Sequence, residues 1–285
     1  MSTLTRSNSK VSGRTMPSLN RILIYFFLIV MSIFFLVPIY MVLITSFKSI
    51  DQISISRMWE LPTSLSIESF VGAFDKLRQG LGNSFLLVIP ATIISAILGS
   101  INGYVLSKWR FRGSNLLFML MLFGMFIPYQ AILIPLVQFL NSINLFNSIY
   151  GLILVHVVYG LPITTLIFRN YYMEIPHEMM VAVAMDGAGF FKLYRYIVLP
   201  ISLPGFVVVI IWQFTQIWNE FLFSVTIAQN TPTVTVALQN LSGSQIAAWN
   251  EQMAAALLAA VPTVIVYVLL GRYFIRGLLA GSVKG

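Results

Sequence analysis

Six apolar stretches, each long enough to cross a lipid bilayer, dominate this sequence of 285 residues. A helix needs about 20 apolar residues to span roughly 30 Å of hydrocarbon. Inside a bilayer the chain must pair all of its own backbone polar groups, which favours helices for stretches of this length. We therefore predict an all-α, polytopic membrane protein with six transmembrane helices near residues 22–46, 81–106, 115–139, 149–168, 203–223 and 252–271.

The distribution of charge predicts the orientation of these helices. Only Glu220, near the end of the fifth stretch, is charged within the six. If the N-terminus is cytoplasmic, 13 of the 17 basic residues lie inside with three acids, and the other four lie outside with six acids. The positive-inside rule then places both termini in the cytoplasm. The net charge of +8 follows from this topology, so it requires no nucleic-acid partner.

The polar segments around the spans differ in character. Residues 1–21 are basic and rich in Ser and Thr, which predicts a disordered cytoplasmic tail before a transmembrane domain over 22–285. The first apolar stretch is too long for the core of a cleaved signal peptide. The outside segment 47–80 contains Trp59 and Pro62, which indicates a packed interfacial loop.

Several kinds of chemistry are missing from the sequence. There is no cysteine, no G-x-x-x-x-G-K-[ST] phosphate loop and no G-x-S-x-G elbow, and the two histidines form no metal-spaced cluster. We therefore expect no catalytic residue, no metal site and no bound cofactor in this chain. Paired carboxylates of the kind that carry protons or sodium through membranes are also missing from the spans. If the chain transports a solute, its energy must come from another subunit.

Three of the spans contain residues that alter helix packing. Gly99 and Gly103, four residues apart, predict a close helix–helix contact. Pro128 and Pro135 interrupt the third span, as either a bend that lines a pathway or a simple kink. His156 in the fourth span is interpreted as a packing residue rather than a ligand or proton carrier.

A patterned cytoplasmic segment at 171–202 is the strongest functional signal. Residues 179–185 are nearly all apolar and are followed by Gly187, which suits a left-handed helix end. A second helix is predicted from Phe190, Leu193, Tyr194 and Ile197, with Lys192 and Arg195 on the other side. Such a helix–glycine–helix hairpin either enters a groove of a partner protein or lies on lipid.

Four sequence motifs resemble those of the permease subunits of ABC importers. Residues 175–188 (IPHEMMVAVAMDGA), with Leu199 and Pro200 after them, are similar to the EAA loop of that family. Asn83 and Ser84 at the second span, residues 218–221 (WNEF) and the tail 276–285 (RGLLAGSVKG) resemble the carbohydrate-uptake group, and in particular the smaller permease of the maltose transporter. The likeness extends from the first span to the last residue.

This resemblance implies a function and a set of partners. The chain would be a multi-pass protein of the cell membrane that pairs with a second, larger permease to form the pathway for a sugar. A dimer of ATPase subunits would bind ATP and Mg, and an extracytoplasmic sugar-binding protein would deliver the sugar. ATP-driven closure of the ATPases would pull on both loops and switch the spans from inward-open to outward-open.

The resemblance also assigns roles to particular residues. Val181, Ala182 and Val183 stand where the family usually has Glu-Ala-Ala, so we expect the contact to depend more on packing, with Glu178 as the remaining acid. Contact with the binding protein, or a role in the outer gate, is assigned to Trp218, Asn219 and Glu220. Coupling to the ATPase is assigned to Glu178, Met179, Val181, Ala182, Met185, Asp186, Gly187, Ala188, Leu199 and Pro200.

The sugar path and the competing functions stay open at this stage. Several polar side chains in or beside the spans could face a sugar, but none is assigned as a ligand, because the family's better-defined site lies mainly in the partner permease. The sequence does not specify which sugar is carried. An ion-driven secondary transporter and a membrane scaffold are the alternatives. The polar side chains in question are Asn102, Gln130, Gln138, Gln213, Gln216 and Asn219.

Overall fold

A computed structural model describes residues 19–109, 111–185, 187–242 and 248–280, and this part of the chain is helical with connecting loops and no strand. Three 3-10 turns are present, η1 (Ile50–Gln52), η2 (Ile55–Arg57) and η3 (Gly124–Phe126), and η4 (Tyr194–Val198) is a π-helical turn. The α-helices are α1 (Leu19–Ser46), α2 (Glu68–Lys108), α3 (Ser114–Phe123), α4 (Tyr129–Ser142), α5 (Ile149–Met173), α6 (His177–Met185), α7 (Phe190–Leu193), α8 (Leu199–Ile201), α9 (Leu203–Trp218), α10 (Leu222–Ile227), α11 (Val234–Ser242) and α12 (Trp249–Ala280). The predicted all-α membrane fold is confirmed.

The predicted number of six spans is reached only if two bent helix pairs are each counted as one span. Four helices, α1, α2, α5 and α12, are long and apolar enough to cross a membrane. Two further spans exist only if bent pairs are counted as one each: α3 and η3 with α4, bent by 102°, and the helix from Phe190 to Ile201 with α9, bent by 74°. Hydropathy along the sequence reports composition and not the direction of a helix. The sequence therefore predicted the first bent pair as one continuous span.

Pro128 accounts for the sharper bend. It lies between η3 and α4 as the N-cap of α4, where its fixed backbone angle and missing N–H do no harm. Pro135 lies inside α4 and does not end that helix. Of the two prolines in the predicted third span, only Pro128 marks a break.

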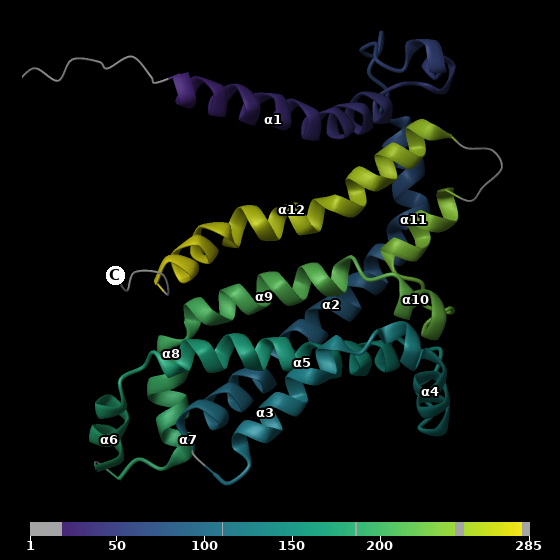
Figure 1. Ribbon diagram of the computed structural model, residues 1–285. Coiled ribbons are helices and arrows are strands. Elements are labelled where there is room, and N and C mark those ends of the chain that lie inside the picture. The colour runs from purple at the N-terminus through teal and green to yellow at the C-terminus, as the bar shows by residue number, and fades with distance from the viewer. Residues whose placement is uncertain (1–18, 110, 186, 243–247, 281–285) are drawn as a thin grey trace, which may run out of the picture.

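The long helices run in roughly the same direction and the short ones gather at the two ends (Figure 1). The hairpin elements α6 and α7 lie at one end, together with the start of α1 and the end of α12. The helices α4, α10 and α11 lie at the opposite end. The two ends of the described chain are therefore on the same side as the hairpin.

The contact between α2 and α5 forms the centre of the fold. A Cβ added at Gly99 would lie 2.5 Å from the Cβ of Thr164, and one added at Gly103 would lie 2.7 Å from the Cβ of Phe168. Thr164 and Phe168 are fully buried on α5. The predicted close contact through Gly99 and Gly103 is confirmed, because no larger side chain fits between the two helices.

Helix α1 lies apart from the rest of the bundle, and its main contact among the described helices is with α12 (Figure 1). Its apolar side chains are exposed along most of its length, and only Ile44 and Ser46 are buried. The structure begins this helix at Leu19, three residues before the predicted span. The rest of the predicted tail lies outside the described residues.

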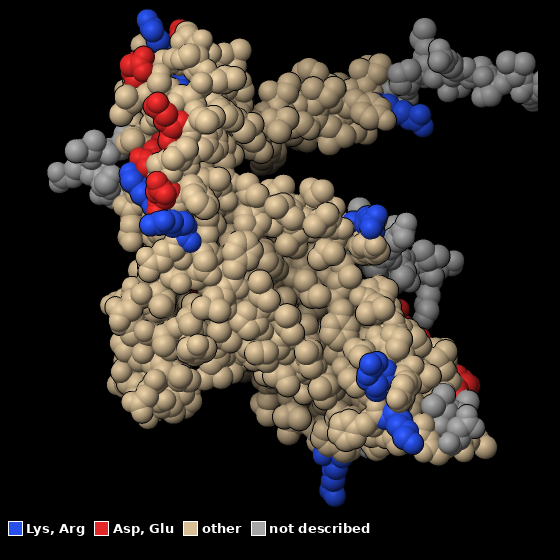
Figure 2. All heavy atoms as spheres, turned by 180° about the vertical axis from the view of Figure 1, so that it is seen from behind, with Lys and Arg blue, Asp and Glu red and all other residues tan. Residues whose placement is uncertain are grey.

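Charged side chains lie mainly at the two ends of the face shown in Figure 2, with a broad uncharged surface between them. At one end acids and bases are mixed. Lys76 on α2 and Glu251 on α12 form an ion pair there, with 2.7 Å between Nζ and Oε2. Basic side chains predominate at the other end. This arrangement is the one expected of a protein whose middle is surrounded by lipid.

Candidate functional site

Among the described side chains of α6, the first helix of the hairpin, one packs into its own chain and several are exposed. Met180 is buried and belongs to the same apolar cluster as Ile175 and Leu193. Met185 is 83% exposed, and Met179 and Val181 are each exposed to about two fifths. These apolar side chains are exposed on the described part of α6, and their contact with another molecule stays a prediction.

The turn after α6 depends on a glycine. Gly187 has a φ of +78°, and a Cβ added there would meet no atom within 4 Å. The predicted left-handed turn is confirmed, and its requirement for glycine comes from the backbone conformation rather than from crowding. Ala188, which follows it, is half-buried. Asp186 and the side chain of Ala182 lie outside the described residues.

The second helix of the hairpin is divided into α7, η4 and α8. The predicted apolar side is confirmed, because Leu193 is buried, Tyr194 and Ile197 are half-buried, and Lys192 and Arg195 are exposed. Leu199 and Pro200 begin α8, where a proline is compatible with the first helical turn. The 74° bend into α9 follows directly. Leu199 and Pro200 therefore lie where the hairpin changes direction toward the next span.

An aromatic cluster holds this second helix against the long helices. The ring of Tyr104 on α2 lies 4.9 Å from Phe190, 5.5 Å from Tyr194 and 6.5 Å from Tyr172, measured between centroids. Tyr104 and Tyr172 are fully buried. Lys108, at the end of α2, donates a hydrogen bond of 2.7 Å from Nζ to the carbonyl of Ile175. The hairpin is thus tied to the bundle at both its start and its second helix.

At the opposite end of the bundle, Glu220 caps a short helix. Its Oε1 accepts a hydrogen bond of 2.6 Å from the N–H of Phe223, and its Oε2 accepts one of 3.2 Å from the N–H of Ser224. A carboxylate at the start of α10 satisfies backbone donors that have no partner within the helix. Glu220 thereby sets the direction in which the chain continues after α9.

His156 is a neighbour of Glu220 that the sequence did not reveal. Its Nε2 lies 3.6 Å from Oε2 of Glu220, and its ring packs edge-on against Phe223. The side chain is buried, and Nε2 has no hydrogen-bond partner among the described residues. Its interpretation as a satisfied packing residue was therefore incomplete. No sequence signal joins it to Glu220, because the two belong to different spans.

Trp218 and Asn219, the other two residues assigned to contact with the binding protein, differ in their exposure. Trp218 is 2% exposed, stacks on Phe214 and donates from Nε1 to the carbonyl of Ala259 on α12 at 2.9 Å. Asn219 is exposed, and its amide nitrogen bonds back to the carbonyl of Thr215. In this conformation Trp218 joins α9 to α12 and offers no free surface to another protein. A role for either residue in a gate stays a prediction.

The polar residues considered for the sugar path are spread over different surroundings. Gln213 is buried on α9, and its amide occupies the space where a side chain at Gly160 would lie. Asn102 is half-buried, and the remaining four are exposed: Gln130, Gln138, Gln216 and Asn219. The structure does not bring the six together into one site.

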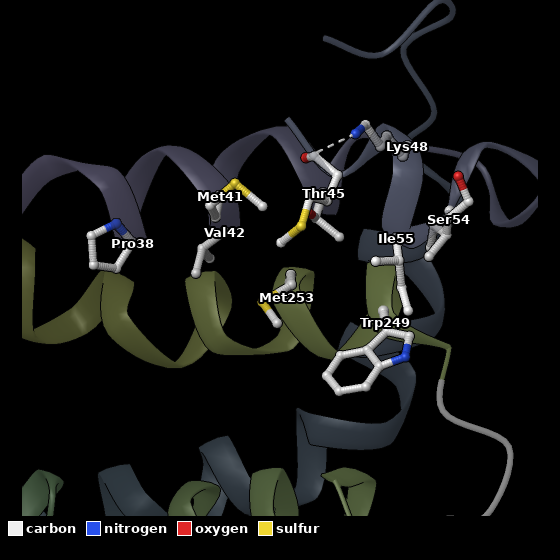
Figure 3. A pocket seen from close by; sticks show the side chains of 11 residues that line it. Pro38, Met41, Val42, Thr45, Lys48, Ser54, Ile55, Trp249 and Met253 are labelled. Atoms are coloured by element: carbon white, nitrogen blue, oxygen red, sulfur yellow. Dashed lines mark hydrogen bonds between the residues drawn. The ribbon is translucent and has the colours of Figure 1, made fainter. Parts of the chain in front are cut away.

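An apolar groove of about 590 Å³ lies far from the hairpin, between α1, the start of α12 and the loop after α1 (Figure 3). Its lining includes Met41, Trp249 and Met253. Lys48 is buried at its edge and donates from Nζ to the carbonyls of Arg57 at 2.9 Å and Met58 at 3.3 Å. Together with the bond from Tyr40 Oη to the carbonyl of Trp59, these contacts hold the loop after α1 in place. The loop predicted over 47–80 is shorter than expected, because α2 begins at Glu68.

Comparison with known proteins gives consistent relatives. The family model described as the binding-protein-dependent transport system inner membrane component matches residues 93–279. A probable ABC transporter permease protein of Pyrococcus horikoshii is 44% identical over 268 residues, which cover 93% of this chain and 98% of that protein. The xylose/arabinose import permease protein of Haloferax volcanii is 37% identical, covering 86% of this chain and 87% of that protein. The glucose import system permease protein of Saccharolobus solfataricus is 33% identical, covering 94% and 98%.

A solved structure shares the fold. A chain in the crystal structure of a bacterial ABC transporter involved in the import of the acidic polysaccharide alginate superposes with a TM-score of 0.78. It is 19% identical, and the match covers 91% of this chain and 99% of that chain.

Proposed function

Because this chain belongs to the family of binding-protein-dependent transport system inner membrane components, we propose that it is a permease subunit of an ABC importer for carbohydrates. The observation that carries the proposal is the family match over residues 93–279, which contains the whole hairpin from α6 to α8. Relatives named for the import of xylose, arabinose and glucose support a sugar as the transported solute.

The hairpin is the proposed point of contact with an ATPase subunit. Met179, Val181 and Met185 present apolar surface at the end of the bundle, while Met180 anchors α6 to its own chain. Full burial of an exposed apolar side chain at such a contact contributes about 1.5–3 kcal/mol to the free energy of binding. Glu178, exposed beside them, supplies the acid that the family's Glu-Ala-Ala sequence would place at Val181. ATP and Mg would be bound by the ATPase, and this chain would contribute no cofactor ligand.

The other partners follow from the same proposal. A second permease would complete the pathway, a sugar-binding protein would dock at the end that carries α4, α10 and α11, and lipid would cover the apolar band. The exposed side chains of α1 are available to such neighbours. Both termini would be cytoplasmic, which agrees with the position of the start of α1 and the end of α12 at the hairpin end of the molecule (Figure 1).

Reconstituted uptake tests this function. The chain is co-purified with a second permease and an ATPase, placed in proteoliposomes, and supplied with the binding protein and a radiolabelled sugar such as glucose or xylose. We expect uptake that requires ATP, the ATPase and the binding protein together. Uptake by the chain alone, driven by an ion gradient, would establish the secondary transporter instead.

Met185→Asp is expected to reduce co-purification of the ATPase about tenfold or more. The side chain is 83% exposed, so the chain should insert normally, but a carboxylate buried in an apolar contact costs more than the 1.4 kcal/mol of a tenfold change. Pull-down of the ATPase through a tag on this chain measures the effect. Met185→Leu keeps an apolar side chain of similar size and should retain the ATPase. Equal recovery in Met185→Asp would remove Met185 from the interface.

Glu220→Gln is expected to reduce the stimulation of ATPase activity by the binding protein several-fold. The amide has one acceptor oxygen instead of two and no charge, so one of the bonds to Phe223 and Ser224 is lost or weakened. Thr226→Val is the control on the same short helix, because the Thr226 hydroxyl donates only to carbonyls of α10 in the described structure and valine keeps its shape. Unchanged stimulation in Glu220→Gln would limit Glu220 to a structural role.

A further inference from the structure

Three hydroxyl groups from three separate elements meet where the hairpin joins the bundle. Ser100 Oγ on α2 lies 2.5 Å from the Tyr172 hydroxyl on α5 and 2.8 Å from the Tyr194 hydroxyl in η4. Ser100 and Tyr172 are fully buried, and Tyr194 is half-buried. Ser100 is the shared partner of both tyrosines, so a single side chain of α2 contacts both α5 and the hairpin.

These hydroxyls are not needed for apolar packing at this place. The rings of Tyr172 and Tyr194 already pack against Tyr104, and phenylalanine rings would fill the same space. A buried hydroxyl carries a desolvation cost and must find a partner, whereas a phenyl ring has no such requirement. The hydroxyl groups therefore add direction and register to a contact whose apolar stability is supplied by the rings.

The position of Tyr194 in the chain gives this contact its importance. Tyr194 begins the π-helical turn η4, a wide turn of a kind found often at functional sites. Directly beyond η4 come α8 and the 74° bend into α9. Tyr194 thus lies between the exposed surface of α6 and the next span, at the place where a displacement of the hairpin would reach the bundle.

We propose that the Ser100–Tyr194 hydrogen bond transmits movement of the hairpin to α2 and, through Tyr172, to α5. Ser100 and Tyr194 act as positioning residues, which keep the hairpin in register with the spans while the ATPase moves it. The inference rests on the proposed function, because it identifies the link through which ATP hydrolysis would drive transport. Without this bond the hairpin stays docked, but its movement is no longer passed fully to the spans.

The test compares Tyr194→Phe and Ser100→Ala with the wild-type chain in proteoliposomes that contain the complete importer. The quantity measured is the number of glucose or xylose molecules imported per ATP hydrolysed. We expect each variant to assemble at the wild-type level and to hydrolyse ATP within about twofold of it. Import per ATP should fall about fivefold in Tyr194→Phe, as loss of one hydrogen bond predicts, and at least as much in Ser100→Ala, which loses the bonds to both tyrosines. The double variant should resemble Ser100→Ala, because Ser100→Ala already lacks the bond to Tyr194 as well as the bond to Tyr172.

Tyr196→Phe is the matched control. Tyr196 belongs to the same π-helical turn, is 70% exposed, and makes no side-chain hydrogen bond within the described part of the chain. It should import as much sugar per ATP as the wild type.

Three results would overturn the inference. These are an unchanged ratio in Tyr194→Phe or Ser100→Ala, equal losses of ATPase activity and import, and a loss of assembled complex in both variants. The last two would indicate a purely structural contact. Failure of the wild-type complex itself to import sugar would contradict the proposed function instead.

Discussion

Gly187→Val is expected to abolish ATP-driven uptake while the chain still inserts into the membrane. Gly187 has a φ of +78°, and a β-branched residue in that left-handed conformation is strained by roughly 1–3 kcal/mol. Because an added Cβ would meet no atom within 4 Å, the strain comes from the backbone alone. The turn is expected to relax to a negative φ, which redirects α6 and misplaces its exposed side chains for the ATPase.

Two substitutions isolate the cause of this effect. Gly189→Val changes a glycine two residues away that also has open space around it but has a φ of −74°, so uptake should be nearly normal. Gly187→Asn should restore part of the uptake, because asparagine tolerates the left-handed conformation better than valine. The measurements are uptake and recovery of the ATPase with the tagged chain. Normal uptake and assembly in Gly187→Val would refute the assignment of this segment as the coupling loop.

Gly103→Leu is expected to prevent folding of the chain, which is a larger effect on stability than any other substitution considered. A Cβ at this position would lie 2.7 Å from the Cβ of Phe168 and 2.8 Å from the backbone nitrogen of Arg169. The second contact is with backbone, so α2 and α5 must move apart. Overpacking of this kind typically costs about 1–3 kcal/mol, and separating the two central helices would exceed that range.

The folded fraction in detergent, measured by size-exclusion chromatography with a fluorescent fusion, tests this prediction. Gly103→Leu should give mostly aggregated protein. Gly82→Leu lies on the same helix, α2, at a position where an added Cβ meets no atom within 4 Å, so it should give a wild-type profile. A monodisperse Gly103→Leu protein with wild-type thermal stability would show that the close approach of α2 and α5 is dispensable.

The features that were predicted correctly from the sequence are those with a local cause. The left-handed turn at Gly187 and the close contact at Gly99 and Gly103 each follow from the small size of one residue type. The apolar side of the second hairpin helix follows from the spacing of its residues. The apolar parts of the four long helices follow from uninterrupted hydropathy, whereas the first turns of α2, from Glu68 to Gly80, were predicted as loop.

The features that were missed depend on residues far apart in the chain. His156 meets Glu220 and Ser100 meets Tyr194 only because helices from different parts of the sequence pack together. The size of the 74° bend before α9 was not predicted either. Such pairings and directions are set by tertiary packing, which periodicity in a single sequence does not report.

The two sides of α6 are under different constraints in evolution. Met180 contributes to the stability of its own chain, so its replacement is limited by the fold. Met179, Val181 and Met185 are exposed, so their replacement costs the fold little and, under the proposed function, would alter the choice of ATPase. An importer could therefore be transferred to a different ATPase by substitutions on one side of a nine-residue helix. By the same reasoning, importers of different sugars whose permeases share these exposed residues would be able to use the same ATPase.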